Sequence, residues 1–293
     1  SEALIDVAEI AELSNENQIR MRTYRKADDG EHQVRAKVYS RGKPLALSES
    51  VPVFENMGLF VDFETGYPVR PARRMSDDGP DVYWIHNLRM KTEAGSKVDL
   101  DEAGDLLEAG FVAVWMGWAE NDGFNRLILS AGASWQESAL VRGLSAYRRQ
   151  SGLDPDKSIQ IRAFTTYPDI TIELLTLFRV LFDTASASLM DVPSLEDERV
   201  LRRLCDLIFA VQRTNFYQPD RKAPLAFKVA SRDIEDLPKP KPYREIFVSS
   251  PLLDGIHLRF GPVARGGLRW SDRPNDFRTE VLGLVKAQQV KNA

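Results

Sequence analysis

The sequence is poor in the two residue types that most often bind metals or form cross-links. It contains one cysteine, Cys205, and three histidines, His32, His86 and His257. A single cysteine cannot form an intramolecular disulfide, and the cysteine and histidines lack the spacing of a zinc site. The scarcity of cysteine fits a reducing compartment, so we expect a cytoplasmic protein without a metal centre.

Long apolar runs and a secretion signal are also lacking. The longest strongly apolar stretch, residues 111–119 (FVAVWMGWA), is far shorter than the roughly 20 residues that a membrane-spanning helix needs. The acidic N-terminus (SEALIDVAEIAELSNEN) has neither the basic start nor the apolar centre of a secretory signal, and it resembles the interior of a longer protein. With a net charge of −4 and no basic cluster, we expect neither nucleic acid nor membrane as a partner.

The first third of the chain shows the pattern of a small α+β unit. Residues 33–40 alternate between apolar and polar side chains, as in a half-buried strand. We expect a helix from an N-cap at Ser48 to Gly58, then strands at residues 59–63 and 82–90, with Gly66 and Pro68 turning the chain between them. This β-α-β-β order resembles the ACT fold, which binds amino acids in many metabolic enzymes. The chain is therefore predicted to be an α+β protein with an ACT-like α+β unit over residues 1–97, although a small α+β unit without a ligand would show the same pattern.

Helical patterns dominate the next region, residues 98–220. Helices are predicted at residues 101–118, 124–130, 135–150, 169–183 and 196–213. One apolar stripe, which indicates packing rather than chemistry, consists of Ile170, Leu174, Leu177, Phe178 and Leu181. Residues 225–229 and 245–249 then read as strands, separated by a Pro/Lys tract at residues 235–242 that we expect to be an extended connector.

Two residues with catalytic potential are assigned structural roles. His86 lies in a predicted strand between apolar neighbours, which favours a core histidine whose ring nitrogens are hydrogen-bonded. Cys205 lies in an apolar helical segment (LCDLIFAV) with no histidine nearby in sequence, which favours an inert buried thiol.

The most informative segment is residues 256–273 (IHLRFGPVARGGLRWSDR). Gly266 and Gly267 allow a positive φ and close approach of the backbone to a ligand. On either side, Arg265 and Arg269 each carry a planar fork of donors that suits a carboxylate. The loop is therefore a candidate anion site, although a turn on a solvated edge would have the same composition.

A helix should follow from about Asp276, capped by Asn275, to the end of the chain, and the acids Asp276 and Glu280 suit its positive N-terminal end. One face of this helix begins apolar and ends polar: Phe277, Val281, Leu284, Gln288 and Lys291. Burial of an amide and an ammonium without partners is costly, so these two groups either line a cavity that holds a charged ligand or emerge into solvent.

Residues 261–293 (GPVARGGLRWSDRPNDFRTEVLGLVKAQQVKNA) resemble the opening of the catalytic domain of the large bacterial NAD-specific glutamate dehydrogenases. A more distant resemblance is to the small hexameric glutamate dehydrogenases. Upstream, LSESVPVFENMGLFV, IHNLRM and WAENDGFNRLIL are similar to the non-catalytic region of the same large family. The resemblance implies three parts: the ACT-like unit (1–97), a helical region (98–220) and the truncated N-terminal part of the substrate-binding domain (221–293).

The resemblance also implies which residues bind substrate. In the small enzymes a lysine precedes the two glycines, whereas this chain has Arg265 there, as in the large family. Gln288 and Lys291 match positions that hold the substrate carboxylates, so the implied role of Lys291 is binding rather than proton transfer. The predicted substrate-binding residues are Arg265, Gly266, Gly267, Arg269, Gln288 and Lys291.

Catalysis by these residues alone is not expected. The family's catalytic lysine and dinucleotide domain correspond to positions beyond Ala293, and the sequence contains no Gly-x-Gly-x-x-Gly after a strand. We therefore expect a segment of an NAD-dependent enzyme, homo-oligomeric in its full-length form, that is inactive by itself. Two other interpretations stay open: a regulatory or assembly module that binds an effector amino acid, and a structural spacer without a ligand.

Overall fold

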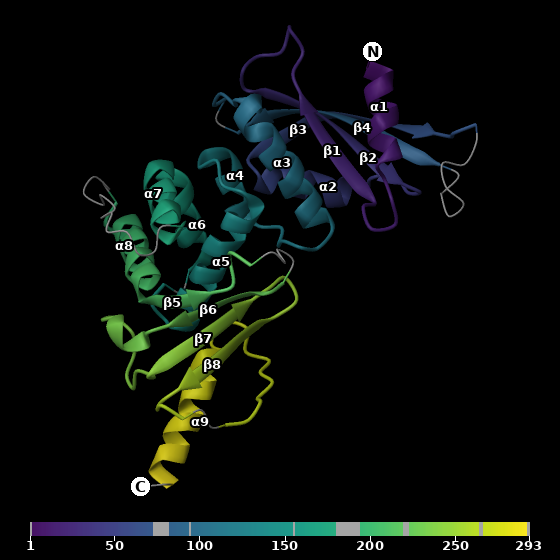
Figure 1. The fold of residues 1–293 in the computed structure, drawn as a ribbon. Coiled ribbons are helices and arrows are strands. Elements are labelled where there is room, and N and C mark those ends of the chain that lie inside the picture. Colours follow the sequence, from purple (N-terminus) through teal and green to yellow (C-terminus); the bar gives the residue numbers. More distant parts are fainter. Residues whose placement is uncertain are drawn as a thin grey trace. The chain divides into compact units, whose positions relative to one another are not determined.

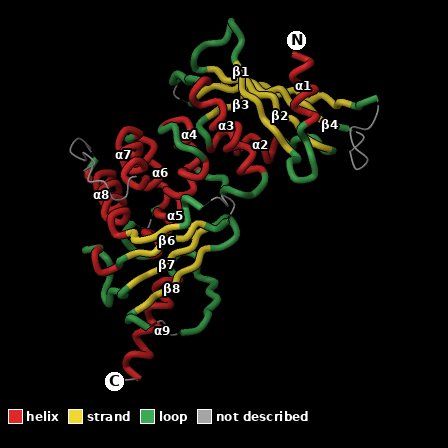
Figure 2. Tube along the Cα trace, in the orientation of Figure 1, coloured by secondary structure: helices red, strands yellow, loops and turns green. Residues whose placement is uncertain are grey.

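The computed structural model describes residues 2–72, 82–93, 95–154, 156–179, 194–218, 223–263 and 266–291. The predicted stripe residue Leu181 and the predicted site residue Arg265 lie outside the described residues. The chain divides into two compact units, Ser1–Trp135 and Gln136–Ala293. Figure 1 labels the elements of each unit, and Figure 2 colours them as helix, strand and loop.

The first unit is built on a four-stranded antiparallel sheet. Its strands are β1 (Ile19–Tyr24), β2 (Gln33–Arg41), β3 (Leu59–Val69) and β4 (Tyr83–Thr92), in the spatial order β1-β2-β4-β3. Helix α2 (Leu47–Asn56) connects β2 to β3, and β4 lies between these two strands, so the three strands and the helix form a split β-α-β unit. The predicted β-α-β-β order is confirmed.

Four further helical segments belong to this unit: α1 (Glu2–Ala11), α3 (Leu100–Trp115), the 3₁₀ turn η1 (Gly123–Arg126) and α4 (Leu127–Ser130). Helices α2 and α3 cover one face of the sheet, where Phe54 and Phe111 stack with ring centroids 4.8 Å apart. On the opposite face, Asp6 of α1 accepts hydrogen bonds from Lys37 Nζ and Tyr39 Oη, both at 2.8 Å. Neither α1 nor β1 is predicted from the sequence.

Several local predictions for this unit are wrong. Helix α2 begins at Leu47 with Ala46 at its N-cap, so Ser48 lies inside the helix. Gly66 and Pro68 lie within β3 rather than in a turn. Strand β3 is an edge strand, which tolerates a proline because its outer side makes no ladder bonds. At Gly66, a side-chain Cβ would come within 2.9 Å of the His86 ring, so glycine gives this ring its room.

Two glycines with a positive φ follow the ends of helices in this unit. Gly58, at a φ of +88°, follows α2 as predicted. Helix α3 ends at Trp115, before the predicted end at residue 118, and Gly117 adopts a φ of +71° just beyond it. Because α3 packs on β1, the helical region that we predict from residue 98 begins with a helix of the α+β unit. The predicted division of the chain at residues 97 and 220 stays a prediction.

His86 has the structural role that the sequence indicates. Its side chain is buried, its Nδ1 lies 2.6 Å from Glu64 Oε1, and its Nε2 accepts a hydrogen bond from the Leu45 N–H at 2.9 Å. Since Nε2 is an acceptor, the proton lies on Nδ1 and is donated to the Glu64 carboxylate. Both ring nitrogens are thus hydrogen-bonded inside the core.

The second unit combines helices with another antiparallel sheet. Its helices α5 (Trp135–Gln150), α6 (Lys157–Thr166), α7 (Pro168–Arg179) and α8 (Leu195–Ala210) precede the strands β5 (Val211–Thr214), β6 (Leu225–Val229), β7 (Arg244–Ser249) and β8 (Asp254–Arg259), which pair in sequence order. The 3₁₀ turn η2 (Ser231–Asp233) follows β6, and α9 (Phe277–Lys291) follows β8.

Three predictions for the second unit need correction. Helix α6 is missed, although Asp156 caps it by accepting from the Ser158 N–H at 2.7 Å. The predicted helix 196–213 ends at Ala210, because Val211 pairs with Val229 in the sheet. The Pro/Lys tract is not an extended connector. The Lys241 ammonium donates to the carbonyl of Ile234, seven residues earlier, at 2.6 Å, so the segment folds back on itself.

Helices α5 and α9 pack on the same face of this sheet. Phe247 of β7 lies at the centre, with Tyr147 of α5 in edge contact at 5.7 Å and Phe277 of α9 stacked at 6.4 Å. Gly143 lets α5 approach the sheet closely, because a Cβ there would meet the Leu225 side chain at 2.9 Å. The sheet therefore fixes α9, the helix that carries two of the predicted site residues.

Candidate functional site

The candidate site begins where β8 ends. After Arg259, whose Nε donates to the Gly261 carbonyl at 2.9 Å, the chain forms a loop that reaches α9 at Phe277. Gly266 adopts a positive φ of +152°, a conformation that suits glycine. The loop also presents the apolar side chains of Leu268 and Trp270 to solvent, with Trp270 80% exposed.

Arg269 is held by an acid on α9. Its Nε and Nη2 donate to Glu280 Oε1 at 2.8 and 2.6 Å, and the Ser271 hydroxyl donates to Glu280 Oε2 at 2.5 Å. The Ser271 hydrogen bond, with help from Arg269, lowers the pKa of Glu280. The Glu280 carboxylate therefore stays charged and folds the second half of the loop back onto the first turn of the helix.

A buried ion pair joins α9 to the sheet. The Nε and Nη2 of Arg278 donate to the two carboxylate oxygens of Glu245 on β7, at 2.9 and 2.7 Å. The two residues are 1% and 0% exposed. Burial disfavours the guanidinium charge, but the Glu245 hydrogen bonds outweigh it and raise the pKa of Arg278. This bidentate geometry is the strongest form of an arginine-carboxylate pair.

Gln150, at the end of α5, completes the anchor. Its Oε1 accepts the Arg278 backbone N–H at 3.2 Å, and its Nε2 donates to the Pro274 carbonyl at 2.7 Å. One amide thus satisfies an N–H of the first helical turn and a carbonyl of the preceding loop, both of which lack helical partners. Side chains from α5, β7 and α9 together set the position of the helix start.

The predicted helix is confirmed, and its face that begins apolar is buried only in part: Phe277 stacks on Phe247 of the sheet. Leu284 is 50% exposed, whereas Arg278 and Leu282 are deeply buried among the α9 side chains that the structure describes. Helix α9 is oriented so that Arg278 faces Glu245 of the sheet. The spacing of the apolar residues in the helix does not predict this orientation. Gln288 and Lys291 lie on α9 as predicted, and their side chains lie outside the described residues.

The described residues include five of the six predicted site residues. Gly266, Gly267 and Arg269 lie on the loop that leads into α9, while Glu280, Ser271, Glu245 and Gln150 are missed as partners. Glu280 is seen from the sequence only as an acid that suits the helix start. Glu245 and Gln150 lie 33 and 128 positions from Arg278 in the chain, and no local pattern joins them.

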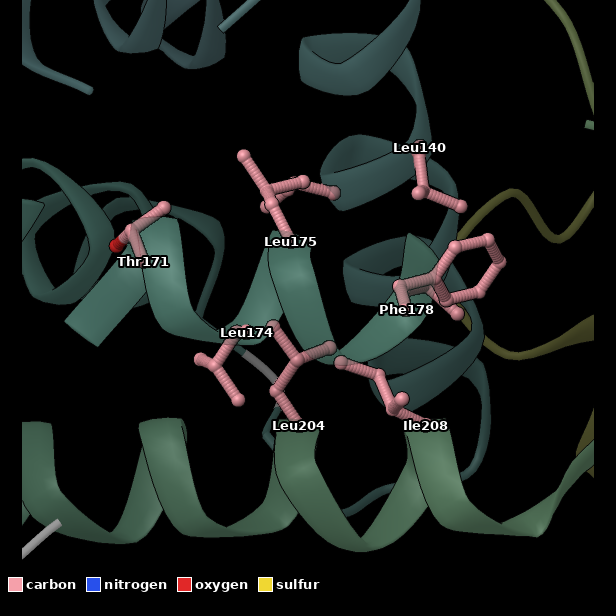
Figure 3. Close-up of a pocket in the computed structure, with 9 residues that line it drawn as sticks. Leu140, Thr171, Leu174, Leu175, Phe178, Leu204 and Ile208 are labelled. Carbon is pink, nitrogen blue, oxygen red and sulfur yellow. The ribbon is translucent and has the colours of Figure 1, made fainter. Parts of the chain in front are cut away.

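A pocket in the helical part of the second unit carries no comparable chemistry. Side chains of α5, α7 and α8 line it, among them Leu140, Leu174, Phe178 and Leu204 (Figure 3). Thr171, the polar residue among the described lining residues, donates its hydroxyl to the Phe164 carbonyl at 2.8 Å. Leu174, Leu177 and Phe178 of the predicted stripe are buried, so packing explains this region.

Other kinds of site also fail to appear in the described part of the chain. Within it, no group of three or more His, Cys, Asp or Glu side chains could hold a metal ion. None of its helices is long and apolar enough to cross a membrane. Cys205 is buried in α8, and burial raises the pKa of its thiol, as expected for an inert cysteine.

Comparison with known families matches three consecutive parts of the chain. Residues 18–103 match "Glutamate dehydrogenase, ACT3 domain", residues 119–184 match "Glutamate dehydrogenase, helical motif 3", and residues 184–293 match "Bacterial NAD-glutamate dehydrogenase, catalytic domain". These matches and the fold define a segment of a large amino-acid dehydrogenase, in which an ACT unit and a helical unit precede the start of a catalytic domain.

Whole-chain relatives agree with this order. The chain is 42% identical to the NAD-specific glutamate dehydrogenase of Pseudomonas aeruginosa over 99% of its length, and 35% identical to that of Mycobacterium tuberculosis over 100%. The chain belongs to the bacterial NAD-specific glutamate dehydrogenase family. It spans 19% of the length of each of these two relatives.

Proposed function

We propose that the loop from residue 261 to 274 and helix α9 form part of the glutamate-binding site of an NAD-dependent glutamate dehydrogenase. The reaction converts L-glutamate, NAD and water to 2-oxoglutarate, ammonia and NADH. The observation that carries the proposal is the catalytic-domain match over residues 184–293, which contains both the double-glycine loop and α9. The proposed contacts to substrate come from Arg265, Gly266, Gly267, Arg269, Gln288 and Lys291.

The chemistry of these residues suits a substrate with two carboxylates. Arg265 and Arg269 offer planar donor forks, and Lys291 offers a compact positive charge. Gly266 and Gly267 let the backbone approach the ligand because they carry no side chain. In this proposal the residues bind and orient glutamate, and none of them transfers a proton in the reaction.

The described residues do not fit NAD. Both four-stranded sheets are antiparallel throughout, whereas the usual dinucleotide crevice lies at the carboxyl ends of parallel strands beside a glycine-rich turn. We therefore assign no residue here to the cofactor and derive no hydride step. We place NAD binding, and with it turnover, in parts of the dehydrogenase other than these residues.

The test is formation of NADH from L-glutamate and NAD, followed by absorbance. We expect the whole dehydrogenase that contains this chain to turn over L-glutamate, with D-glutamate and L-glutamine as negative controls. A polypeptide of these 293 residues alone should show no turnover, because no catalytic acid or base and no cofactor site is assigned to it. Turnover by the 293 residues, or its absence in the whole dehydrogenase, would contradict the proposal.

The same proposal covers the cellular compartment and the oligomeric state of the enzyme. We place the dehydrogenase in the cytoplasm, in keeping with the single cysteine among these 293 residues, and we propose that it acts as a homo-oligomer. The family resemblance supports the oligomer.

A second role is proposed for the α+β unit, namely binding of an effector amino acid. The split β-α-β arrangement and the ACT3 match over residues 18–103 favour it. A ligand that binds only the folded state raises the melting temperature, so at least one amino acid at millimolar concentration should raise it by several degrees. The shift should persist in a Lys291→Met variant, which separates it from substrate binding. If all amino acids leave the melting temperature unchanged, the effector role is wrong.

A further inference from the structure

Glu280 connects helix α9 to the loop that precedes it. It lies one turn into α9, its side chain is 16% exposed, and both of its carboxylate oxygens accept hydrogen bonds from the loop. Oε1 accepts from two nitrogens of Arg269, and Oε2 accepts from the Ser271 hydroxyl. A carboxylate that is bound at both oxygens fixes the direction of the guanidinium it holds.

Arg269 keeps part of its donor capacity under this arrangement. Its Nε and Nη2 are bound to Glu280, while Nη1 makes no hydrogen bond to the residues that the structure describes. The side chain is 58% exposed. An arginine offers five N–H donors, so a guanidinium held along one edge can still donate to a ligand carboxylate from another.

The support for Glu280 is rigid. Two residues before it, Arg278 is locked to Glu245 and Gln150 in the interior, so the first turn of α9 cannot shift without breaking buried hydrogen bonds. A continuous chain of contacts therefore runs from β7 through α9 and Glu280 to Arg269. In binding sites, such supporting hydrogen bonds orient the ligand-contacting group and carry much of the affinity.

We propose that Glu280 is a positioning residue that holds the Arg269 side chain and the loop around it in the orientation that receives a substrate carboxylate. This inference rests on the proposed function, because it needs the loop to bind glutamate. Glu280 itself does not touch substrate and acts through Arg269.

A simpler role for Glu280 would be a favourable charge at the positive start of a helix. Asp276 provides a matched control for that role. It also lies at the start of α9 and also pairs with a loop arginine, Arg273, at 2.9 Å, but Arg273 is not among the proposed substrate contacts. Glu280→Gln and Asp276→Asn each remove one negative charge near the same helix end, so a difference between them isolates the contact with Arg269.

The experiment uses the whole dehydrogenase that contains this chain, with two readouts. Hydrogen exchange measured by mass spectrometry reports peptides that cover residues 266–272, and steady-state kinetics reports KM and kcat for L-glutamate. In Glu280→Gln we expect faster exchange in these peptides and a KM for L-glutamate raised about tenfold, with kcat changed less than KM and the KM for NAD unchanged. Asp276→Asn should leave both readouts close to wild type.

The outcomes separate the inference from the proposed function. Unchanged exchange in Glu280→Gln overturns the inference, whatever the kinetics. Faster exchange with an unchanged KM also overturns it, since the loop would then not control binding of substrate. An equal rise of KM in both variants would assign Glu280 to the helix charge alone. A wild-type dehydrogenase without activity on L-glutamate would refute the proposed function, and unchanged exchange would still overturn the loop-holding role independently.

Discussion

Replacement of Arg278 by alanine should lower the free energy of unfolding of the second unit by about 3–5 kcal/mol. The reason is that Glu245, which is 0% exposed, would lose the partner that hydrogen-bonds both of its carboxylate oxygens in the interior. Loss of the Arg278 side chain, which is 1% exposed, also leaves a cavity in the interior. Urea denaturation of the wild-type and variant chains measures the difference.

Two control variants test whether the loss of stability in Arg278→Ala comes from the buried ion pair. Replacement of both partners, as Glu245→Leu with Arg278→Met, removes the charges while filling the space, so we expect far less destabilisation than in the single variant. Arg202→Ala breaks an exposed i,i+4 pair with Glu198 and should change the stability little. If Arg278→Ala were as stable as Arg202→Ala, the buried pair would not anchor α9.

The sequence predicts those parts of the fold that depend on local patterns. The α5 helix matches its predicted bounds, and its apolar residues Leu140, Leu144 and Tyr147 are buried at helical spacing. The strand at residues 33–40 is found because Val34, Ala36 and Val38 alternate with polar residues, and all three are 0% exposed in the sheet. In such segments, local periodicity and tertiary burial agree.

Other elements depend on contacts that a local pattern cannot show. Val211 continues an apolar helical run, but pairing with Val229 makes it a strand. Gly66 and Pro68 resemble turn residues, but the edge position of β3 and the room needed by the His86 ring keep them in the sheet. In both cases a distant partner overrides the local preference.

The candidate site shows the same division. The double-glycine loop and the extent of α9 follow from glycine conformation and periodicity, and family resemblance supplies the proposed roles of Gln288 and Lys291. The orientation of α9 does not follow from the sequence. The buried ion pair between Arg278 and Glu245 sets this orientation. The helical periodicity of α9 does not mark Arg278 as buried, because its partner Glu245 lies on β7, before the loop.

The second large effect is expected for Lys291, a proposed substrate contact on α9. In the whole dehydrogenase, Lys291→Met should raise the KM for L-glutamate about 100-fold, because a carboxylate loses its charge-assisted partner while the side chain keeps its length. Since the proposed role is binding rather than proton transfer, kcat should change much less than KM, and the KM for NAD should stay the same.

Lys286→Met is the matched control for this variant. Lys286 lies on the same helix and is exposed, so the same loss of charge there should leave the KM for L-glutamate within about twofold of wild type, as for most surface substitutions. A difference between the two variants would assign the effect to the position of Lys291 rather than to the charge of the helix.

The KM for L-glutamate in the Lys291→Met dehydrogenase is therefore the measurement that tests most directly whether α9 belongs to the substrate site. We expect this KM to rise about 100-fold with kcat nearly retained. A KM equal to that of wild type and of Lys286→Met would contradict it, and a loss of kcat at unchanged KM would show that Lys291 takes part in the chemistry instead of in binding.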